Sequence, residues 1–247
     1  HLCADTAPRK VLAPLSRSAY RRPLDDHDMS RLMTFFYEGH KQSGFEAGIE
    51  SAIAAILASP HFLLKIEREP DDHAAGDIYS ISDIELASRL SFFLWSSIPD
   101  ETLLDLAERK ELRKPRVLEE QVKRMLADEK ASNLATNFAS QWLHLRNLDG
   151  ITPDGRLYPD FDDNLRQSMR QETQQHMKEL IATDGSILDL IRADHTFLNE
   201  RLAKHYGIPH IYGSRFRRVE LPDESHRGGV LRHGSILTVT SYATRTS

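Results

Sequence analysis

Residues 82–95 read SDIELASRLSFFLW, and this stretch decides the fold class. Ser82 and Glu85 have the spacing of a capping box, in which the serine oxygen accepts from the glutamate amide and the glutamate carboxylate accepts from the serine amide. Apolar residues then recur at helical spacing around most of the circumference, which is typical of a helix covered on nearly all sides. The stretch therefore predicts a central, buried helix.

The same helical period continues on both sides of this stretch. Apolar positions three and four residues apart recur through most of the chain, and proline, glycine or aspartate residues separate the repeats. Further helices are expected over residues 8–19, 25–43, 46–58, 99–107, 115–126, 134–145, 161–182, 187–191 and 197–206. The sequence thus predicts an all-α protein, an irregular multi-helix bundle of about ten helices.

The last part of the chain has a different pattern. Residues 216–221 read FRRVEL and alternate between apolar and polar side chains, which predicts a strand. Gly228 and Gly229 predict a turn, and residues 231–239 form a short apolar run. A short mixed C-terminal segment that can hold a β-hairpin is therefore expected after the helices.

One composition break suggests a domain boundary. Residues 68–76 bring together two prolyl or glycyl breakers and several acidic residues, which is typical of a linker. We therefore predict an N-terminal helical domain over residues 1–68 and a main helical domain over 77–210. Residues 211–247 are interpreted as the start of a third, truncated domain.

The composition excludes several classes of protein. Of the 247 residues, 40% are hydrophobic and 28% are charged, a mixture typical of a globular chain. Twelve glycines, eleven prolines and the single Cys3 exclude collagen, low-complexity chains and disulfide scaffolds. No apolar run approaches the roughly 20 residues of a membrane span, and the formal charge of -5 argues against general nucleic-acid binding.

A search for catalytic motifs finds no nucleotide-binding glycine loop, no zinc-protease motif and no hydrolase nucleophile motif. Glu172, His176 and Glu179 share one face of a long predicted helix. They are either half of a metal site or a solvated polar face with a local glutamate–histidine ion pair. The second interpretation is favoured because glutamines surround them, so no metal site is expected.

Two other features have plain structural interpretations. Trp95 and Trp142 fall at helical spacing with leucines and are expected in the core. Arg21 and Arg22 either bind an anion or place positive charge at the C-terminus of a helix, and the second interpretation is favoured.

The C-terminal segment is rich in arginine. It holds six arginines against three acidic residues. The arginines are Arg215, Arg217, Arg218, Arg227, Arg232 and Arg245. One interpretation is an anion-binding edge for carboxylate or phosphate, in which Gly228 and Gly229 let the backbone beside Arg227 approach a ligand closely. The other, which is favoured, is a solvated hairpin whose arginines pair with the acidic helical body.

Several longer motifs resemble a known family. The matching stretches are AYRRPL at 19–24, GFEAGI at 44–49, SPHFLL at 59–64, YSISDIELASRLSFFLWSS at 79–97, TFLN at 196–199, HYG at 205–207, RGGVL at 227–231 and LTVTS at 237–241. On these motifs the chain resembles the cytochrome-c-linked multi-domain proteins of unknown function that are expanded in planctomycetes and found in other bacteria. The resemblance covers nearly the whole chain.

The resemblance implies a piece of a large bacterial protein, exported to the periplasm or otherwise outside the cytoplasm. The chain starts at His1 without a methionine and stops at Ser247 inside a family motif, so a fragment is expected. Family members carry c-type haem motifs in other domains. We therefore expect no cofactor within this fragment, c-type haem on the missing domains, and those domains as partners. Any partner of Cys3 would also lie there.

Two functions from different classes follow. The first is the helical scaffold of a c-type-haem-linked oxidoreductase or electron carrier, with Arg217, Arg227 and His233 facing the haem or binding an anion. The alternative is a non-catalytic binding or assembly module for a polymer or a protein partner. Whether the chain is an enzyme stays open, since no catalytic residue is defined; an independent hydrolase is disfavoured because its motifs are absent.

Overall fold

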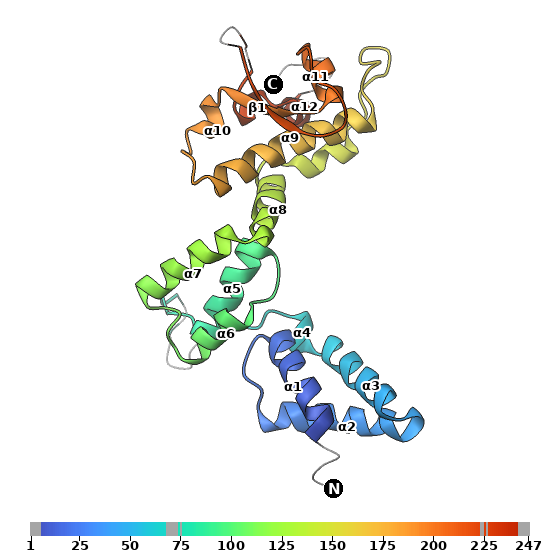
Figure 1. The fold of residues 1–247 in the computed structure, drawn as a ribbon, viewed down its shortest axis with the longest axis vertical. Helices are drawn as coiled ribbons and strands as arrows, with labels where there is room; N and C mark the ends of the chain where they lie inside the picture. The colour runs from blue at the N-terminus through green and yellow to red at the C-terminus, as the bar shows by residue number, and fades with distance from the viewer. Residues whose placement is uncertain (1–5, 68–73, 75, 223–224, 226, 242–247) are drawn as a thin grey trace. The chain divides into compact units, whose positions relative to one another are not determined.

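The computed structural model describes residues 6–67, 74, 76–222, 225 and 227–241 (Figure 1). The chain divides into two compact units, His1–Arg124 and Met125–Ser247, which are described separately. Helices dominate both units, and the strands among the described residues are limited to one antiparallel pair. The predicted all-α class is confirmed. Within the described ranges, no helix combines the length and the apolar character needed to cross a bilayer.

The first unit is built from helices alone among its described residues. They are α1 (Thr6–Tyr20), α2 (Asp26–Ser43), α3 (Phe45–Leu57), α4 (Pro60–Leu63), α5 (Asp83–Trp95), α6 (Glu101–Glu108) and α7 (Pro115–Ala127), the last of which continues into the second unit.

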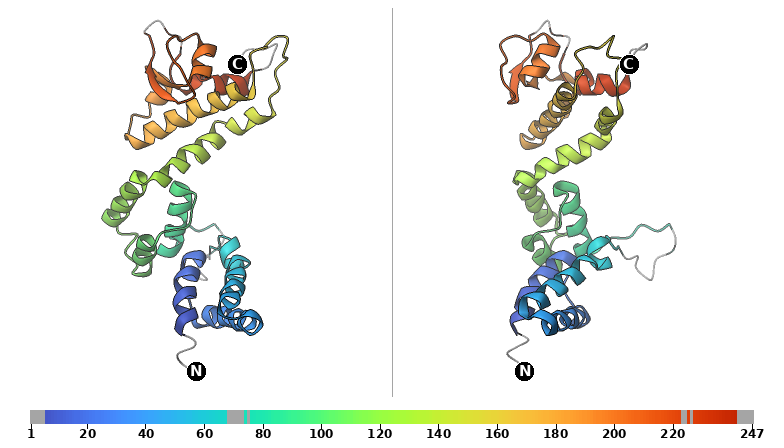
Figure 2. Two further views of the ribbon diagram at one scale, coloured as in Figure 1. Left: turned by 45° about the vertical axis from the view of Figure 1, so that its right-hand side comes forward. Right: turned by 90° about the vertical axis from the view of Figure 1, so that its right-hand side faces the viewer.

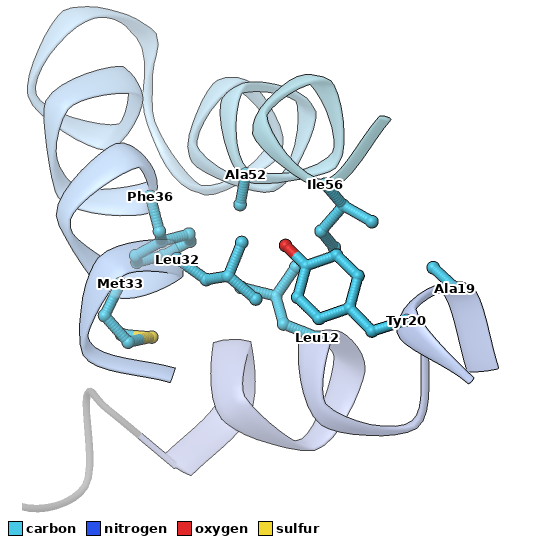
Figure 3. Close-up of a cluster of buried hydrophobic side chains, with 8 residues drawn as sticks. All are labelled: Leu12, Ala19, Tyr20, Leu32, Met33, Phe36, Ala52 and Ile56. Atoms are coloured by element: carbon cyan, nitrogen blue, oxygen red, sulfur yellow. The ribbon is translucent and has the colours of Figure 1, made fainter. Parts of the chain in front are cut away.

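Helices α1, α2 and α3 enclose the first core (Figure 3). Its buried side chains are Leu12, Ala19, Tyr20, Leu32, Met33, Phe36, Ala52 and Ile56. Gly48 lets α3 approach α2 closely, because a Cβ at this position would lie 2.7 Å from the carbonyl oxygen of Phe36. Gly44, with φ +89°, makes the sharp turn that joins the two helices.

Arg21 connects the end of α1 to α4 through hydrogen bonds. It adopts a left-handed conformation with φ 58° and is buried. Its guanidinium donates hydrogen bonds of 2.6–3.2 Å to the backbone carbonyls of Ala19, His61, Phe62 and Leu64. Arg22 instead pairs with Asp28 at 2.6 Å. Both arginines therefore make contacts within the fold. The bond from Arg21 to the carbonyl of Ala19 agrees with the favoured interpretation, in which positive charge lies at the C-terminus of a helix.

The capping box of α5 forms as its sequence predicts. The amide of Glu85 donates to Ser82 Oγ at 3.2 Å, and the amide of Ser82 donates to Glu85 Oε2 at 2.7 Å. Trp95 is buried, but the side chain of Phe93 is 60% exposed. The helix is thus less completely covered than its apolar circumference suggested.

The second unit combines helices with two short strands. In chain order it contains η1 (Glu129–Ala131), α8 (Ser132–Trp142), η2 (Leu145–Gly150), α9 (Asp163–Ala182), α10 (Asp189–Arg192), β1 (His195–Leu198), α11 (Glu200–Tyr206), β2 (Arg217–Glu220), η3 (Val230–Arg232) and α12 (Gly234–Thr240). Helix α9 contacts α8, β1, α11 and α12, and Figure 2 shows the orange and red segments lying against it. It is the central element of this unit.

Two details of the second unit differ from the sequence predictions. The helix expected over residues 197–206 is a strand followed by a helix, and Asn199 caps that helix by accepting from the amide of Leu202 at 2.9 Å. The strand predicted at 216–221 is present as β2, but its antiparallel partner is β1, with His195 opposite Glu220. The apolar run 231–239 is largely helical.

Trp142 does not lie in the core. Its side chain is 51% exposed and stacks against Phe138, with ring centroids 5.8 Å apart. The core positions of α8 are instead the small residues Ala135 and Ala139, which pack against Met177 of α9. The helical spacing was correct, but it assigned the buried face to the bulky side chains.

Candidate functional site

Several of the most buried polar side chains described in the second unit lie on α9. Glu172, Thr173 and His176 are all buried, and Glu172 is only 1% exposed. The favoured interpretation of this face as solvated is therefore wrong. Strand β1, helix α11 and the segment leading into α12 cover it, and none of these contacts can be read from the spacing of residues within α9.

Both carboxylate oxygens of Glu172 are occupied by hydroxyl groups. Thr196 donates to Oε1 and Tyr206 donates to Oε2, each at 2.6 Å. The Tyr206 hydroxyl in turn accepts from the amide of Gly234 at 2.7 Å. Burial raises the pKa of Glu172 to about 7, although these hydrogen bonds and the charge of Arg227 act in the opposite direction.

His233 connects the C-terminal segment to the same helix. Its Nδ1 lies 2.9 Å from Thr173 Oγ1, and that hydroxyl lies 2.7 Å from Ser235 Oγ. Its Nε2 has no hydrogen-bond partner among the described residues. Burial, reinforced by His176 and Arg227, lowers the pKa of His233 to about 3, so the ring is neutral.

His176 lies between two other imidazoles. Its ring centroid is 5.3 Å from that of His233 and 5.6 Å from that of His195. His176 Nε2 lies 3.2 Å from the carbonyl oxygen of Asp189, and burial lowers its pKa. His195 is held by acidic side chains instead, with Nε2 2.5 Å from Glu179 Oε2.

The three imidazoles do not form a metal centre. Within the part of the chain that the structure describes, no group of three histidine, cysteine or acidic side chains has an arrangement that could hold a metal ion. Glu172, one of the three residues in the less favoured metal-site interpretation, has both oxygens bonded to hydroxyls. Through these hydrogen bonds the cluster connects β1, α11 and the C-terminal segment to α9.

Beside this cluster, the guanidinium of Arg227 lies over the ring of Tyr206. The guanidinium carbon is 3.4 Å from the ring centroid, a cation–π contact, and Nη1 lies 3.4 Å from the carbonyl oxygen of Arg232. The two side chains border a pocket of about 340 Å³, which we name the Tyr206 pocket. Its lining residues are Tyr206, Ile208, Ser225, Arg227, Arg232 and Leu237.

Gly228 and Gly229 hold the chain after Arg227 close to the preceding elements. Their φ angles are +123° and +66°, and a Cβ at Gly229 would lie 2.5 Å from the carbonyl oxygen of Ile191. The close backbone approach expected at this pair of glycines is thus made to the chain near α10.

The structure brings two of the three predicted site residues together. The charge of Arg227 lowers the pKa of both His233 and Glu172. Arg217, in contrast, lies on β2 and donates to the carbonyl oxygen of Tyr212 at 2.5 Å. Arg218 pairs with Glu179 at 3.1 Å, so for this arginine the interpretation as a partner of the acidic helical body holds. The haem-facing or anion-binding role of Arg217, Arg227 and His233 stays a prediction.

Sequence reasoning did not single out Thr196 and Tyr206 as site residues. The signal was present only as two short motifs of the resemblance, TFLN at 196–199 and HYG at 205–207. Neither motif names a chemistry, because each hydroxyl acquires its role only through contact with Glu172, some 24 and 34 positions away.

Two family models match the chain. PSD4, a protein of unknown function (DUF1592), matches residues 81–208, and PSD5, a protein of unknown function (DUF1595), matches residues 7–67. No curated protein and no solved structure matches the chain. The predicted domain boundaries at 1–68, 77–210 and 211–247 stay predictions.

Proposed function

The chain belongs to the DUF1592 family of proteins of unknown function, and we propose that it is the helical scaffold of a c-type-haem-linked oxidoreductase or electron carrier. The proposal takes its redox part from the resemblance to cytochrome-c-linked bacterial proteins. It takes its scaffold part from the second unit, where the buried polar groups join elements together.

One observation carries the scaffold role. Glu172 is the buried acid whose pKa is raised to about 7, which is the usual mark of a catalytic carboxyl group. Its two oxygens are nevertheless filled by the hydroxyls of Thr196 and Tyr206, and its side chain is almost fully buried. A general acid or base must reach a substrate proton. The geometry therefore supports a structural use of this group.

A c-type haem would be carried by another part of the longer protein. Covalent attachment through C-x-x-C-H needs two cysteines, and this sequence has only Cys3. When bound to that other part, the haem would supply the electron-transfer chemistry. In this proposal the present chain orients its redox domain and acts outside the cytoplasm.

The test is a haem spectrum of the full-length gene product. We expect a reduced-minus-oxidised difference spectrum of c-type haem when the protein is expressed with cytochrome maturation machinery, and none when that machinery is omitted. We also expect a C-x-x-C-H motif in the coding sequence outside residues 1–247. A well-folded full-length protein that shows no haem under either condition would overturn the proposal and leave the binding or assembly module.

A further inference from the structure

We propose that the Tyr206 pocket binds a small organic carboxylate, one that carries its negative charge on an apolar body. The inference rests on the geometry of the pocket alone and holds whether or not the chain serves a haem domain. Its chemistry is divided between a guanidinium with unused donors, a second arginine and an apolar wall.

The first step concerns the donors of Arg227. A guanidinium has five N–H donors, and the single side-chain hydrogen bond of Arg227 among the described residues goes from Nη1 to the carbonyl oxygen of Arg232 at 3.4 Å. Contact with the Tyr206 ring holds the guanidinium beside the pocket. A planar fork with free N–H groups matches the two oxygens of a carboxylate.

The second step concerns charge. Arg232 is exposed, borders the same pocket, and forms no ion pair with the residues that the structure describes; the same is true of Arg227. The acidic side chain that the charge of Arg227 reaches is Glu172, which is buried and bonded to two hydroxyls. The pocket thus offers two positive charges that form no ion pair within the described part of the chain.

The third step concerns size and apolar surface. Ile208, Leu237 and the ring of Tyr206 supply apolar walls. The volume of about 340 Å³ lies at the lower end of the roughly 300–1,000 Å³ that is usual for ligand sites. These dimensions favour a small aliphatic or aromatic acid over a nucleotide, and the apolar walls favour it over inorganic phosphate.

Binding is tested by titrating the ¹⁵N-labelled 247-residue chain with benzoate and following the arginine side-chain Nε–Hε signals. Benzyl alcohol serves as the neutral analogue and inorganic phosphate as the anion without an apolar body. We expect a saturable shift of the Arg227 signal with benzoate, and at least tenfold weaker binding of the other two probes.

Variants identify the group responsible. Arg227→Gln removes the charge and the fork, so benzoate binding should be lost. Arg227→Lys keeps the charge but not the bidentate geometry, so affinity should fall about tenfold. Arg215→Gln is the matched control, because it removes an exposed arginine of the same unit that does not line the pocket. It should leave the affinity unchanged.

Several results would overturn the inference: no saturable shift with benzoate, equal affinity for benzyl alcohol or phosphate, or unchanged binding in Arg227→Gln. If Arg227→Gln loses its helical circular dichroism, Arg232→Gln replaces it. Arg232 is exposed, so this variant should fold normally, and loss of the positive charge should weaken benzoate binding severalfold. The haem spectrum is independent of all these readouts, so failure of one proposal is distinguishable from failure of the other.

Discussion

Glu172 is a buried acid on α9 whose two carboxylate oxygens accept hydrogen bonds from the hydroxyls of Thr196 and Tyr206. Its position four residues before His176 correctly placed the two side chains on one face of α9. The spacing did not reveal that β1 and α11 cover this face, because those contacts come from residues far along the chain. Helical periodicity identifies which residues share a face, and tertiary packing decides whether that face is exposed to solvent.

Glu172→Gln should reveal the cost of burying this carboxyl group. The pKa of Glu172 rises from 4.5 to about 7 on folding, so its stabilising contribution is present below pH 4.5 and is lost as the pH rises through 7. The loss is on the order of 3 kcal/mol. A glutamine does not titrate, so the variant should gain stability relative to the wild type between pH 4.5 and 8.

This difference can be measured by urea unfolding at several pH values. Glu129→Gln is the matched control, since Glu129 is exposed and lies in the same unit. The control should follow the wild-type pH profile. A Glu172→Gln profile parallel to that of the wild type would show that the carboxyl group is not perturbed as the structure implies.

His233 should give the opposite pH dependence. Its pKa falls from 6.5 in the unfolded chain to about 3 in the fold, so the stability it confers is present above pH 6.5 and is lost as the pH falls toward 3. The groups that face it and disfavour its charge are His176, His195 and Arg227. Between pH 7 and pH 5 its contribution should decrease by about 2 kcal/mol.

His233→Asn keeps a polar group where Nδ1 meets Thr173 and removes the titration. Its overall stability should be lower at pH 7, because a buried ring is replaced by a smaller side chain. The fall in stability from pH 7 to pH 5, followed by thermal unfolding, should nevertheless be about 2 kcal/mol smaller than in the wild type. His27→Asn, at an exposed histidine of α2, should keep the wild-type slope.

Elements with local signals were predictable, and elements made by distant pairing were not. The α5 capping box lies entirely within four residues, and its hydrogen bonds form as expected. Strand β1 was mistaken for the start of a helix, because His195–Leu198 becomes a strand only by pairing with Arg217–Glu220. The same limitation applies to the Tyr206 pocket. Its walls come from the end of α11 and Ile208, from Ser225, Arg227 and Arg232, and from Leu237 of α12.

Gly229 tests how the C-terminal segment is positioned. Its φ is +66°, and a Cβ at this position would lie only 2.5 Å from the carbonyl oxygen of Ile191, so there is no room for a side chain. Gly229→Ala should therefore destabilise the second unit by roughly 2 kcal/mol or more. It should also displace Arg227 from Tyr206, since Gly228 alone lies between Arg227 and the substituted residue.

Gly155→Ala is the matched control, because a Cβ there meets no atom within 4 Å. Its stability should stay within about 0.5 kcal/mol of the wild type. Chemical denaturation gives both values. Equal stability of the two variants would mean that the segment around Gly229 can move away from α10 without cost.

At the scale of the whole molecule, composition and periodicity were sufficient to predict the all-α class. They could not show how the core is divided. The buried clusters of the second unit, such as Met177 with Ala139 and Leu165 with Leu202, use side chains of that unit alone. The cluster around Leu12 is likewise formed within α1, α2 and α3.

This division predicts that damage to the first core stays in the first unit. Arg21→Gln removes a guanidinium that donates hydrogen bonds to four backbone carbonyls. A glutamine amide group can donate to at most two. Buried carbonyls without donors destabilise by about 1–3 kcal/mol each. Amide hydrogen exchange should accordingly become faster in α1 and α4 and stay unchanged in α9. Arg9→Gln, at an exposed position of α1, should alter neither region. Faster exchange in α9 of the Arg21 variant would instead show that the two cores unfold as one cooperative body, because α9 makes none of the contacts that Arg21 provides.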